Sequence, residues 1–154
     1  MITIAETDDD LAQVRALFSE YASSIGVDLS FQDFDREFEN LPGEYAPPSG
    51  CILLARMGSE PVGCVALRRI SEEICEMKRL YVNSSFRRKS IGRKLSESVI
   101  AEARSRGYRI MKLDTLPSMR DALRLYESLG FAKTTPYRYN PIKGTVFMQL
   151  DLTT

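Results

Sequence analysis

Apolar residues recur at a helical period in the first third of the chain and at a strand period after about residue 50. Residues 1–5 alternate between apolar and polar side chains, as a short strand does. From Asp8 to about Ala22, apolar side chains recur every three or four residues behind three acidic residues, which predicts a helix. Residues 31–41 repeat that spacing and predict a second helix. The run 42–50, rich in proline and glycine, is typical of a loop.

The middle of the chain favours strands. The segments 51–57, 62–69 and 74–82 are joined by short polar turns, which predicts an antiparallel meander. A polar, basic loop over residues 83–90 follows. The remaining elements are a helix from Ile91 to about Ser105, a strand over 109–115, a helix over 119–129, and two strands over 131–137 and 145–152.

These elements predict one domain of the α/β (α+β) class over residues 1–154, with a mixed central sheet of about seven strands flanked by about four helices. Its 154 residues suffice to bury a core, and 44% hydrophobic and 27% charged residues are ordinary for a soluble protein. No run approaches the ~18 apolar residues of a membrane span, and the N-terminus lacks the regions of a signal peptide. We therefore expect a cytoplasmic protein that binds no membrane.

The three cysteines, Cys51, Cys64 and Cys75, are odd in number and lie far apart among apolar residues. This pattern predicts buried thiols, and neither a disulfide framework nor a metal site. The chain has no histidine, which removes the usual base at neutral pH and the commonest zinc ligand. Acid–base chemistry would have to use carboxylates, tyrosine, cysteine, lysine or water, and no metal is expected.

The charges balance overall, with 21 basic and 21 acidic residues, which argues against a protein that binds nucleic acid over its whole surface. They are unevenly placed, however. Residues 1–50 hold 11 acids and 2 bases, a net of −9, so residues 51–154 carry +9. An acidic third that binds cations beside a basic part that binds anions would explain this asymmetry, and solvated faces without a role remain an alternative.

A strand delivers the chain into residues 86–95, where a loop becomes a helix. The first turn of a helix has N–H groups without an intrahelical partner, and together with the helix dipole they attract anions. Gly92 lets a ligand approach the backbone closely. A diphosphate fits this chemistry, although the spacing is neither that of a P-loop nor that of a GxGxxG fingerprint. Five cations lie within eight residues: Arg87, Arg88, Lys89, Arg93 and Lys94.

Two motifs resemble those of the GNAT superfamily of acyl-coenzyme A-dependent N-acetyltransferases. The run Arg87-x-x-Ser90-x-Gly92 matches the family's Arg/Gln-x-x-Gly-x-Gly/Ala signature at two of three defined positions. The run Leu125-Tyr-Glu-Ser-Leu-Gly-Phe131 is similar to the family's Leu-Tyr-Glu-x-x-Gly-Phe helix ending. The motifs occur in the expected order, with one strand between them. With the element order, the resemblance covers roughly residues 51–150.

The resemblance implies acetyl-coenzyme A as the cofactor. In the family, the strand that ends here at Val82 is splayed from its neighbour, and Tyr126 matches a tyrosine that protonates the departing thiolate. The exposed backbone groups of Leu80, Tyr81 and Val82 would pair with the pantetheine arm and the acyl carbonyl. The pyrophosphate would be held by backbone N–H groups of a continuous run: Arg87, Arg88, Lys89, Ser90, Ile91, Gly92 and Arg93.

Two positions depart from the family pattern. Ser90 stands where the family usually has glycine, so a side chain occupies space near the phosphates, or its hydroxyl caps the helix instead. Met119 stands where the family often has an asparagine that contacts the cofactor arm. Both departures bear on cofactor affinity.

The chemistry also needs a group that deprotonates the acceptor. An alkyl amine with a pKa near 10.4 is the free base in only about one molecule in 2,500 at pH 7. Glu76 is the best candidate base, because at a strand period it shares one face with Lys78, Leu80 and Val82. A cross-strand ion pair with Arg68 or Arg69 is the alternative.

Asp114, at the end of the next predicted strand, is a weaker candidate for the base. Tyr126 has an alternative role as well, because Ala122, Leu125, Tyr126 and Leu129 form one helical stripe and would be core residues. Phe31, Phe34 and Phe38 would line the acceptor pocket or, alternatively, belong to the core.

The resemblance implies an enzyme that transfers an acetyl group from acetyl-coenzyme A to a primary amine by direct attack. The acidic first third fits a small cationic amine or a peptide with basic residues. A non-catalytic acyl-coenzyme A-binding module is the alternative, suggested only by Ser90 and Met119. Nucleic acid is not an expected partner, because the basic cluster lacks interleaved aromatics. A homodimer is left open.

Overall fold

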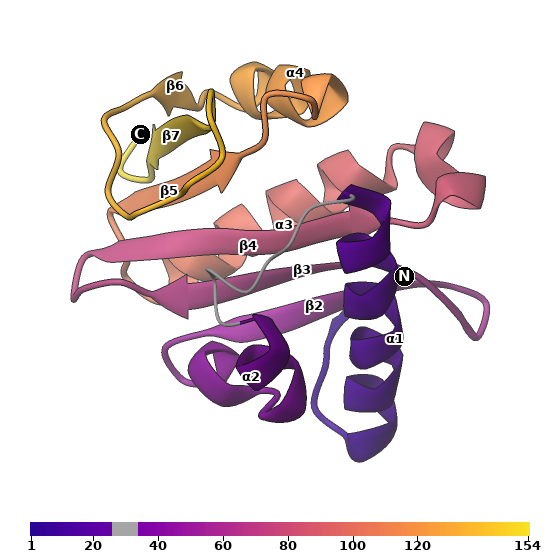
Figure 1. Ribbon diagram of the computed structural model, residues 1–154. Helices are drawn as coiled ribbons and strands as arrows, with labels where there is room; N and C mark the ends of the chain where they lie inside the picture. Colours follow the sequence, from indigo (N-terminus) through magenta and orange to yellow (C-terminus); the bar gives the residue numbers. More distant parts are fainter. Residues whose placement is uncertain (26–33) are drawn as a thin grey trace.

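The computed structural model of the protein describes residues 1–25 and 34–154 (Figure 1). Its seven-stranded sheet has the order β1-β2-β3-β4-β5-β7-β6. The strands are β1 (Ile2–Ile4), β2 (Cys51–Met57), β3 (Glu60–Arg69), β4 (Ile74–Val82), β5 (Ile110–Thr115), β6 (Ala132–Lys133) and β7 (Val146–Asp151). The helices are α1 (Asp8–Ile25), α2 (Phe34–Glu39), α3 (Ile91–Ser105) and α4 (Arg120–Ser128), with 3-10 turns η2 (Gly43–Tyr45) and η3 (Ser84–Lys89).

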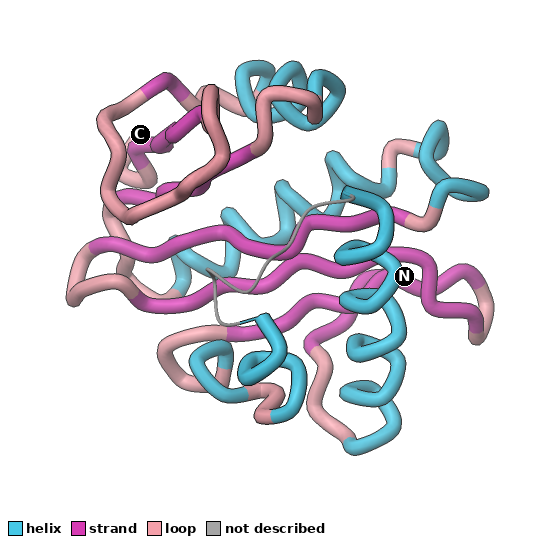
Figure 2. Tube along the Cα trace, viewed as in Figure 1, coloured by secondary structure: helices cyan, strands magenta, loops and turns pink. Residues whose placement is uncertain are grey.

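One pair of neighbouring strands is parallel and opens along its length. β4 and β5 pair only over residues 74–76 and 110–112, whereas the other neighbours in the sheet are antiparallel. Beyond that short ladder the two strands part, and Figures 1 and 2 show the gap widening toward their carboxyl ends. The splay that the family resemblance implied at Val82 is therefore present.

The sheet is covered on both faces, because residues that alternate along β2 and β3 enter two different cores. Val14, Leu17 and Phe18 of α1 pack on one face against Ile52 and Leu54. The opposite face packs against α3 and α4. Its core includes Leu53, Val65, Met77, Leu95, Val99, Met111, Tyr126 and Phe131. The predicted fold class, a mixed seven-stranded sheet with four helices among the described residues, is confirmed.

Several predicted boundaries change. The strand expected over residues 131–137 shrinks to the two residues of β6, because the chain then leaves the sheet for an irregular segment before β7. The basic loop 83–90 contains the turn η3, and α1 runs to Ile25 rather than Ala22. Of the helix expected over 31–41, residues 34–39 are helical, while Phe31 lies outside the described residues.

The three thiols are free and buried, as the sequence predicts. Burial raises the pKa of Cys51 to about 11 and that of Cys75 to about 12, and it raises the pKa of Cys64 still further. Such thiols are inert at neutral pH. None of the helices in the described parts of the chain has the length and apolar character needed to cross a membrane.

Candidate active site

A bulge in β4 reorients the residues that face the splayed edge. Lys78 lies opposite Ala66 and Tyr81 lies opposite Cys64, so two β4 residues, Arg79 and Leu80, oppose a single residue of β3. Arg79 has φ of 61°, the left-handed region that a non-glycine residue occupies only when its surroundings enforce it. Here the Arg79 guanidinium pairs with Glu37 of α2 at 2.8 Å, and this ion pair holds the strained backbone in place.

The bulge overturns the prediction that one face of β4 carries Glu76, Lys78, Leu80 and Val82. Before the bulge, Cys75 and Met77 enter the core beneath α3, so Glu76 and Lys78 face the other way. After it, Leu80 and Val82 pack against that same α3 core. The extra residue shifts the strand period by one, which places the charged residues and the apolar pair on opposite faces.

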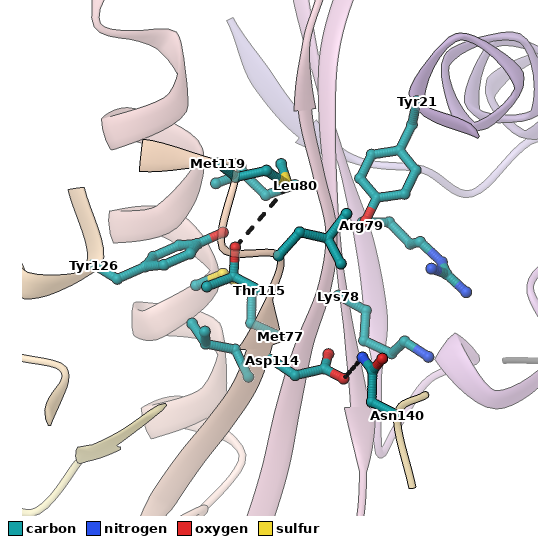
Figure 3. A pocket seen from close by; sticks show the side chains of 12 residues that line it. Tyr21, Met77, Lys78, Arg79, Leu80, Asp114, Thr115, Met119, Tyr126 and Asn140 are labelled. Atoms are coloured by element: carbon teal, nitrogen blue, oxygen red, sulfur yellow. Dashed lines mark hydrogen bonds between the residues drawn. The ribbon is translucent and has the colours of Figure 1, made fainter. Parts of the chain in front are cut away.

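A pocket lies between the parted strands (Figure 3). Its walls come from β4, β5, α4 and the segment before it, α1, and the loop before β7. The residues that line it are Tyr21, Met77, Lys78, Arg79, Leu80, Leu113, Asp114, Thr115, Leu116, Met119, Tyr126 and Asn140. The opening of the β4–β5 pair thus brings Tyr126, Leu80 and Asp114, three residues singled out in the sequence, to one site.

Tyr126 lies at the α4 end of this pocket. The residue is only 6% exposed, and its ring packs against Phe131 with centroids 5.7 Å apart. Figure 3 shows its hydroxyl pointing into the pocket, and in the described parts of the chain that hydroxyl has no hydrogen-bond partner. Burial raises the pKa of Tyr126 above its usual range, so the hydroxyl keeps its proton at neutral pH. The ring thus makes the core contact that the sequence offered as an alternative, while the acid role of Tyr126 stays a prediction.

The backbone at the end of β4 offers an N–H group to the pocket side. Asn83 donates its N–H to the carbonyl of Val62 at 2.8 Å, which makes Val82 and Gly63 a pair without mutual hydrogen bonds. The N–H and C=O of Val82 therefore point toward the edge that β5 has left. The carbonyl already accepts a hydrogen bond from Arg87 Nε at 3.0 Å. Hence the N–H of Val82 is the group that remains to bind a ligand.

The start of α3 has the features of an anion site. Lys94 donates to Ser90 O at 3.1 Å and closes the first turn, so the N–H groups of Ile91, Gly92 and Arg93 have no intrahelical partner. A Cβ at Gly92 would meet its nearest neighbours at an ordinary 3.8 Å, so packing does not demand glycine there. Because glycine has no side chain, a ligand can approach these N–H groups closely. They fit the pyrophosphate of coenzyme A.

Some basic side chains around this turn bond to other parts of the protein, and others are exposed to solvent. Arg87 bonds the end of β4, and Arg93 donates from Nη2 to Ser128 Oγ of α4 at 2.5 Å. Lys89 is exposed beside the turn. The backbone N–H groups, rather than a ring of guanidinium groups, therefore form the centre of the site.

The backbone of Ser90, directly before α3, is strained. It has φ of 61° and ψ of 20°, and its side chain makes no capping hydrogen bond, so the alternative of a hydroxyl cap was wrong. A left-handed residue directly before a helix explains why the family prefers glycine here.

Replacing Ser90 by glycine should raise the free energy of unfolding by about 1 kcal/mol, because glycine adopts this conformation without strain. Chemical denaturation of both proteins measures the difference. Ser90→Ala is the matched control and should bring no gain, since alanine keeps the Cβ. An equal gain from alanine would show that the hydroxyl, and not the backbone, is the source of the strain.

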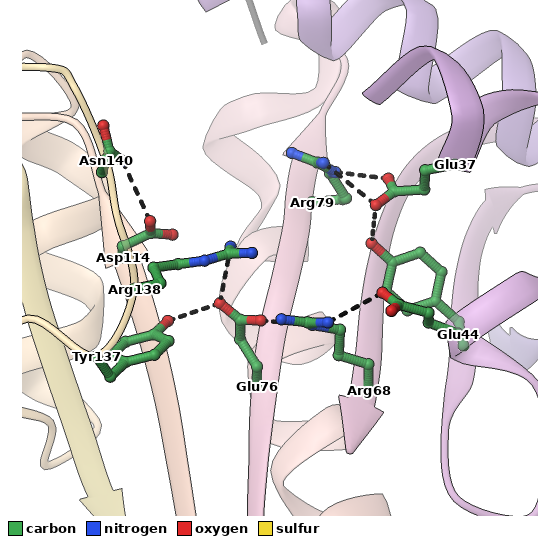
Figure 4. Close-up of polar contacts among 10 residues, drawn as sticks. Glu37, Glu44, Arg68, Glu76, Arg79, Asp114, Tyr137, Arg138 and Asn140 are labelled. Atoms are coloured by element: carbon green, nitrogen blue, oxygen red, sulfur yellow. Dashed lines mark hydrogen bonds and ion pairs between the residues drawn. The ribbon is translucent and has the colours of Figure 1, made fainter. Parts of the chain in front are cut away.

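Glu76 lies at the centre of a buried ion network at the point where β4 and β5 part (Figure 4). The residue is fully buried, and one of its oxygens accepts from Arg68 Nε at 2.6 Å. The other oxygen accepts from Tyr137 Oη at 2.6 Å and from Arg138 Nη1 at 3.2 Å. The cross-strand partner that the sequence offered as an alternative, Arg68, is therefore present.

The network also sets the charge of Glu76. Burial alone would raise the pKa of its carboxyl group, but the charges of Lys78, Arg138 and Arg68 outweigh that effect and hold the pKa below its usual value. A carboxylate so stabilised, with both oxygens engaged, is a weak proton acceptor. Its role as the base stays a prediction, and the network gives it a structural role.

The acidic first third of the chain finds partners on the sheet. Asp10 pairs with Arg56 at 2.6 Å. Glu37 pairs with the buried Arg79, and Glu44 with Arg68 at 2.9 Å. Some of the acidic residues in the first part of the chain are therefore neutralised by ion pairs with basic residues in the second part.

Sequence reasoning missed Lys78, Arg138 and Asn140. Lys78 was visible only as one polar residue in a strand, and the bulge that sets its direction leaves no sequence signal. Arg138 and Asn140 lie between the strands expected over residues 131–137 and 145–152, in a stretch to which no role was assigned. Asn140 Nδ2 donates to Asp114 Oδ2 at 3.2 Å across the mouth of the pocket.

Comparisons with known proteins agree with this geometry. The family model described as Acetyltransferase (GNAT) family matches residues 11–131. An uncharacterised N-acetyltransferase of Schizosaccharomyces pombe is 39% identical over 153 residues, covering 98% of this chain and 94% of that protein. N-acetylaspartate synthetase of Danio rerio is 33% identical over 119 residues, covering 75% of this chain and 42% of that protein.

Among solved structures, a GNAT family acetyltransferase from Elizabethkingia anophelis with acetyl-CoA bound has a TM-score of 0.58 and 26% identity. The match covers 67% of this chain and 76% of that chain. A domain with a splayed parallel pair, a pocket between the two strands and an anion site at the next helix is an acyltransferase domain. The chain belongs to the GNAT acetyltransferase family, so the family and enzyme class expected from the two motifs are confirmed.

Proposed function

We propose that the protein transfers the acetyl group of acetyl-CoA to a primary amine by direct attack within the pocket between β4 and β5. The observation that carries the proposal is the position of Tyr126, a buried residue whose hydroxyl has no hydrogen-bond partner among the described residues and lies in the same pocket as the splayed end of β4. Acetyl-CoA, when bound, supplies the acetyl group as a thioester. The N–H groups of Ile91, Gly92 and Arg93 would hold its pyrophosphate.

The chain's own groups then have distinct tasks. The N–H of Val82 donates a hydrogen bond to the carbonyl oxygen that gains negative charge. The amine nitrogen forms the new C–N bond as the C–S bond breaks, and Tyr126 gives its proton to the sulfur. The pocket holds the two reactants together, which contributes a large part of such rate enhancements.

The proton released by the amine needs an acceptor. Asp114 lines the pocket and has one oxygen engaged by Asn140, so it can accept that proton directly or through water. Glu76 is a poorer proton acceptor, because Arg68, Tyr137 and Arg138 already bond both of its carboxylate oxygens. We therefore propose Asp114 before Glu76, which reverses the order that the sequence favoured.

The acceptor is an amine by analogy with the relatives. The name of the Danio rerio relative, N-acetylaspartate synthetase, is that of an enzyme whose product is an N-acetylated amino acid. The cationic amine or peptide expected from the net charge of residues 1–50 stays a prediction, although several of those carboxylates have arginine partners. The cytoplasmic location and the homodimer also stay predictions.

Release of free thiol from acetyl-CoA in the presence of a broad panel of amines tests the proposal. Turnover that depends on an amine, with an N-acetylated product seen by mass spectrometry, is the expected result. Binding of acetyl-CoA without turnover for any amine would contradict it and would favour the non-catalytic binding module.

A further inference from the structure

The pocket contains a buried cation that none of the described residues pairs. Lys78 lines the pocket and is 7% exposed. In the parts of the chain that the structure describes, its ammonium group takes part in no hydrogen bond and in no ion pair within 4.0 Å. Burial, together with the neighbouring Arg79, lowers the pKa of Lys78 from 10.5 to about 8. Keeping such a group buried is costly unless an anion joins it.

The carboxylates near Lys78 are already engaged. Glu76, which attracts the ammonium from a distance, has Arg68, Tyr137 and Arg138 as partners. Glu37 is paired with Arg79. Among the residues that the structure describes, neither of these carboxylates is left to pair with the Lys78 ammonium on the β4 wall of the pocket.

Arg138 adds donors next to this charge. Its side chain is 22% exposed, and among the described residues only its Nη1 is bonded, to Glu76 at 3.2 Å. A guanidinium group has five N–H donors, so several remain for a ligand. After burial and Arg79, the positive charge of Arg138 is a further cause that lowers the pKa of Lys78.

The β5 wall of the pocket carries a negative charge, whereas the β4 wall carries a positive one. Asp114 of β5 carries a carboxylate whose only partner among the described residues is the Asn140 amide. Figure 3 shows the Asp114–Asn140 pair beside the Lys78 side chain, with Tyr126 further along the pocket. The pocket thus presents a cationic wall and an anionic wall to one molecule.

We propose that the acceptor is an amino carboxylate, whose carboxylate group binds Lys78 and Arg138 while its amine lies toward Asp114 and Tyr126. This rests on the proposed N-acetyltransferase activity and names the substrate class of that same pocket. A diamine or polyamine would bring a second cation against Lys78 and Arg138, so the geometry disfavours the cationic acceptor expected from the charge of residues 1–50.

Paired acceptors test the inference directly. Each α-, β- and γ-amino acid is assayed beside its own carboxamide, which has the same skeleton and lacks the negative charge. We expect the wild-type protein to show a kcat/KM at least tenfold higher for the best amino acid than for its carboxamide. The Lys78→Met variant should lose that preference, because its kcat/KM for the amino acid should fall to about that for the matching carboxamide.

Two further variants keep the result interpretable. Lys133→Met removes an exposed lysine from β6 and should keep the preference. Lys78→Arg retains the charge and should keep most of it. Thermal unfolding of Lys78→Met beside the wild type shows that the preference is measured on a folded protein.

The outcomes separate the two proposals. If amines are acetylated but amino acids gain nothing over their carboxamides, or Lys78→Met keeps the preference, the amino carboxylate inference is wrong and the acetyltransferase proposal stands. If no amine is acetylated, the acetyltransferase proposal fails and the inference fails with it.

Discussion

Replacing Glu76 by glutamine should lower the free energy of unfolding by about 3 kcal/mol, because the substitution leaves buried cations without their anion. Arg68 and Arg138 both bond this carboxylate, and Lys78 is attracted to it. Glutamine keeps the shape of the side chain and one acceptor oxygen, so the change isolates the loss of charge. A domain of this size has a stability of about 5–15 kcal/mol and should still fold. Denaturant unfolding followed by circular dichroism gives the difference.

The matched control is Glu44→Gln. Glu44 pairs with the same arginine at 2.9 Å, but its side chain is 72% exposed. Exposed ion pairs contribute little, so this variant should lose less than about 1 kcal/mol. A loss of similar size in both variants would mean that the buried network adds nothing beyond a surface pair.

The pH dependence of the protein's stability follows in part from the Glu76 carboxylate. Its pKa is lowered in the folded protein, so its stabilisation is complete above the ordinary glutamate pKa of 4.5. That contribution is lost as the pH falls through the lower folded value. The Glu76→Gln variant should therefore lose less stability than the wild type when both are acidified below pH 4.5.

The same variant tests the catalytic role that the sequence favoured. If Glu76 were the base, Glu76→Gln would lower kcat at least a hundredfold while the protein kept its stability. We expect the reverse pattern, with a clear loss of stability and a kcat within tenfold of the wild type.

The order of the elements and the anion site were predictable because they depend on local sequence. Hydrophobic period and glycine positions define the meander, α3 and α4, and the motif around Gly92 marks a helix start with free N–H groups. Tyr126 was found through its motif, and its helical stripe correctly indicated that the ring is buried.

What sequence reasoning missed depends on contacts between distant segments. The bulge at Arg79 is enforced by a carboxylate 42 residues away, Glu37, so the strand period alone gave the wrong face for Leu80 and Val82. Arg138 reaches Glu76 over 62 residues. The net charge of residues 1–50 is a weak guide to the acceptor for a related reason, since total charge does not say which carboxylates are paired within the fold.

Replacing Tyr126 by phenylalanine should lower kcat about a hundredfold, because the variant removes the proton donor and keeps the ring. The packing against Phe131 at 5.7 Å involves the ring alone, so the free energy of unfolding should change little. Burial holds the pKa of Tyr126 above its usual range, so the loss should be the same at every pH from 6 to 9.

Steady-state kinetics with the best amine of the panel, together with unfolding of the same preparation, give both quantities for Tyr126→Phe. Tyr139→Phe removes a hydroxyl from a residue that is 78% exposed and serves as the control, with kcat expected to stay at the wild-type value. KM for acetyl-CoA should change less than threefold in Tyr126→Phe, because the cofactor is held mainly at the start of α3. A kcat within threefold of the wild type would make Tyr126 a core aromatic only, and the proton for the sulfur would then have to come from water.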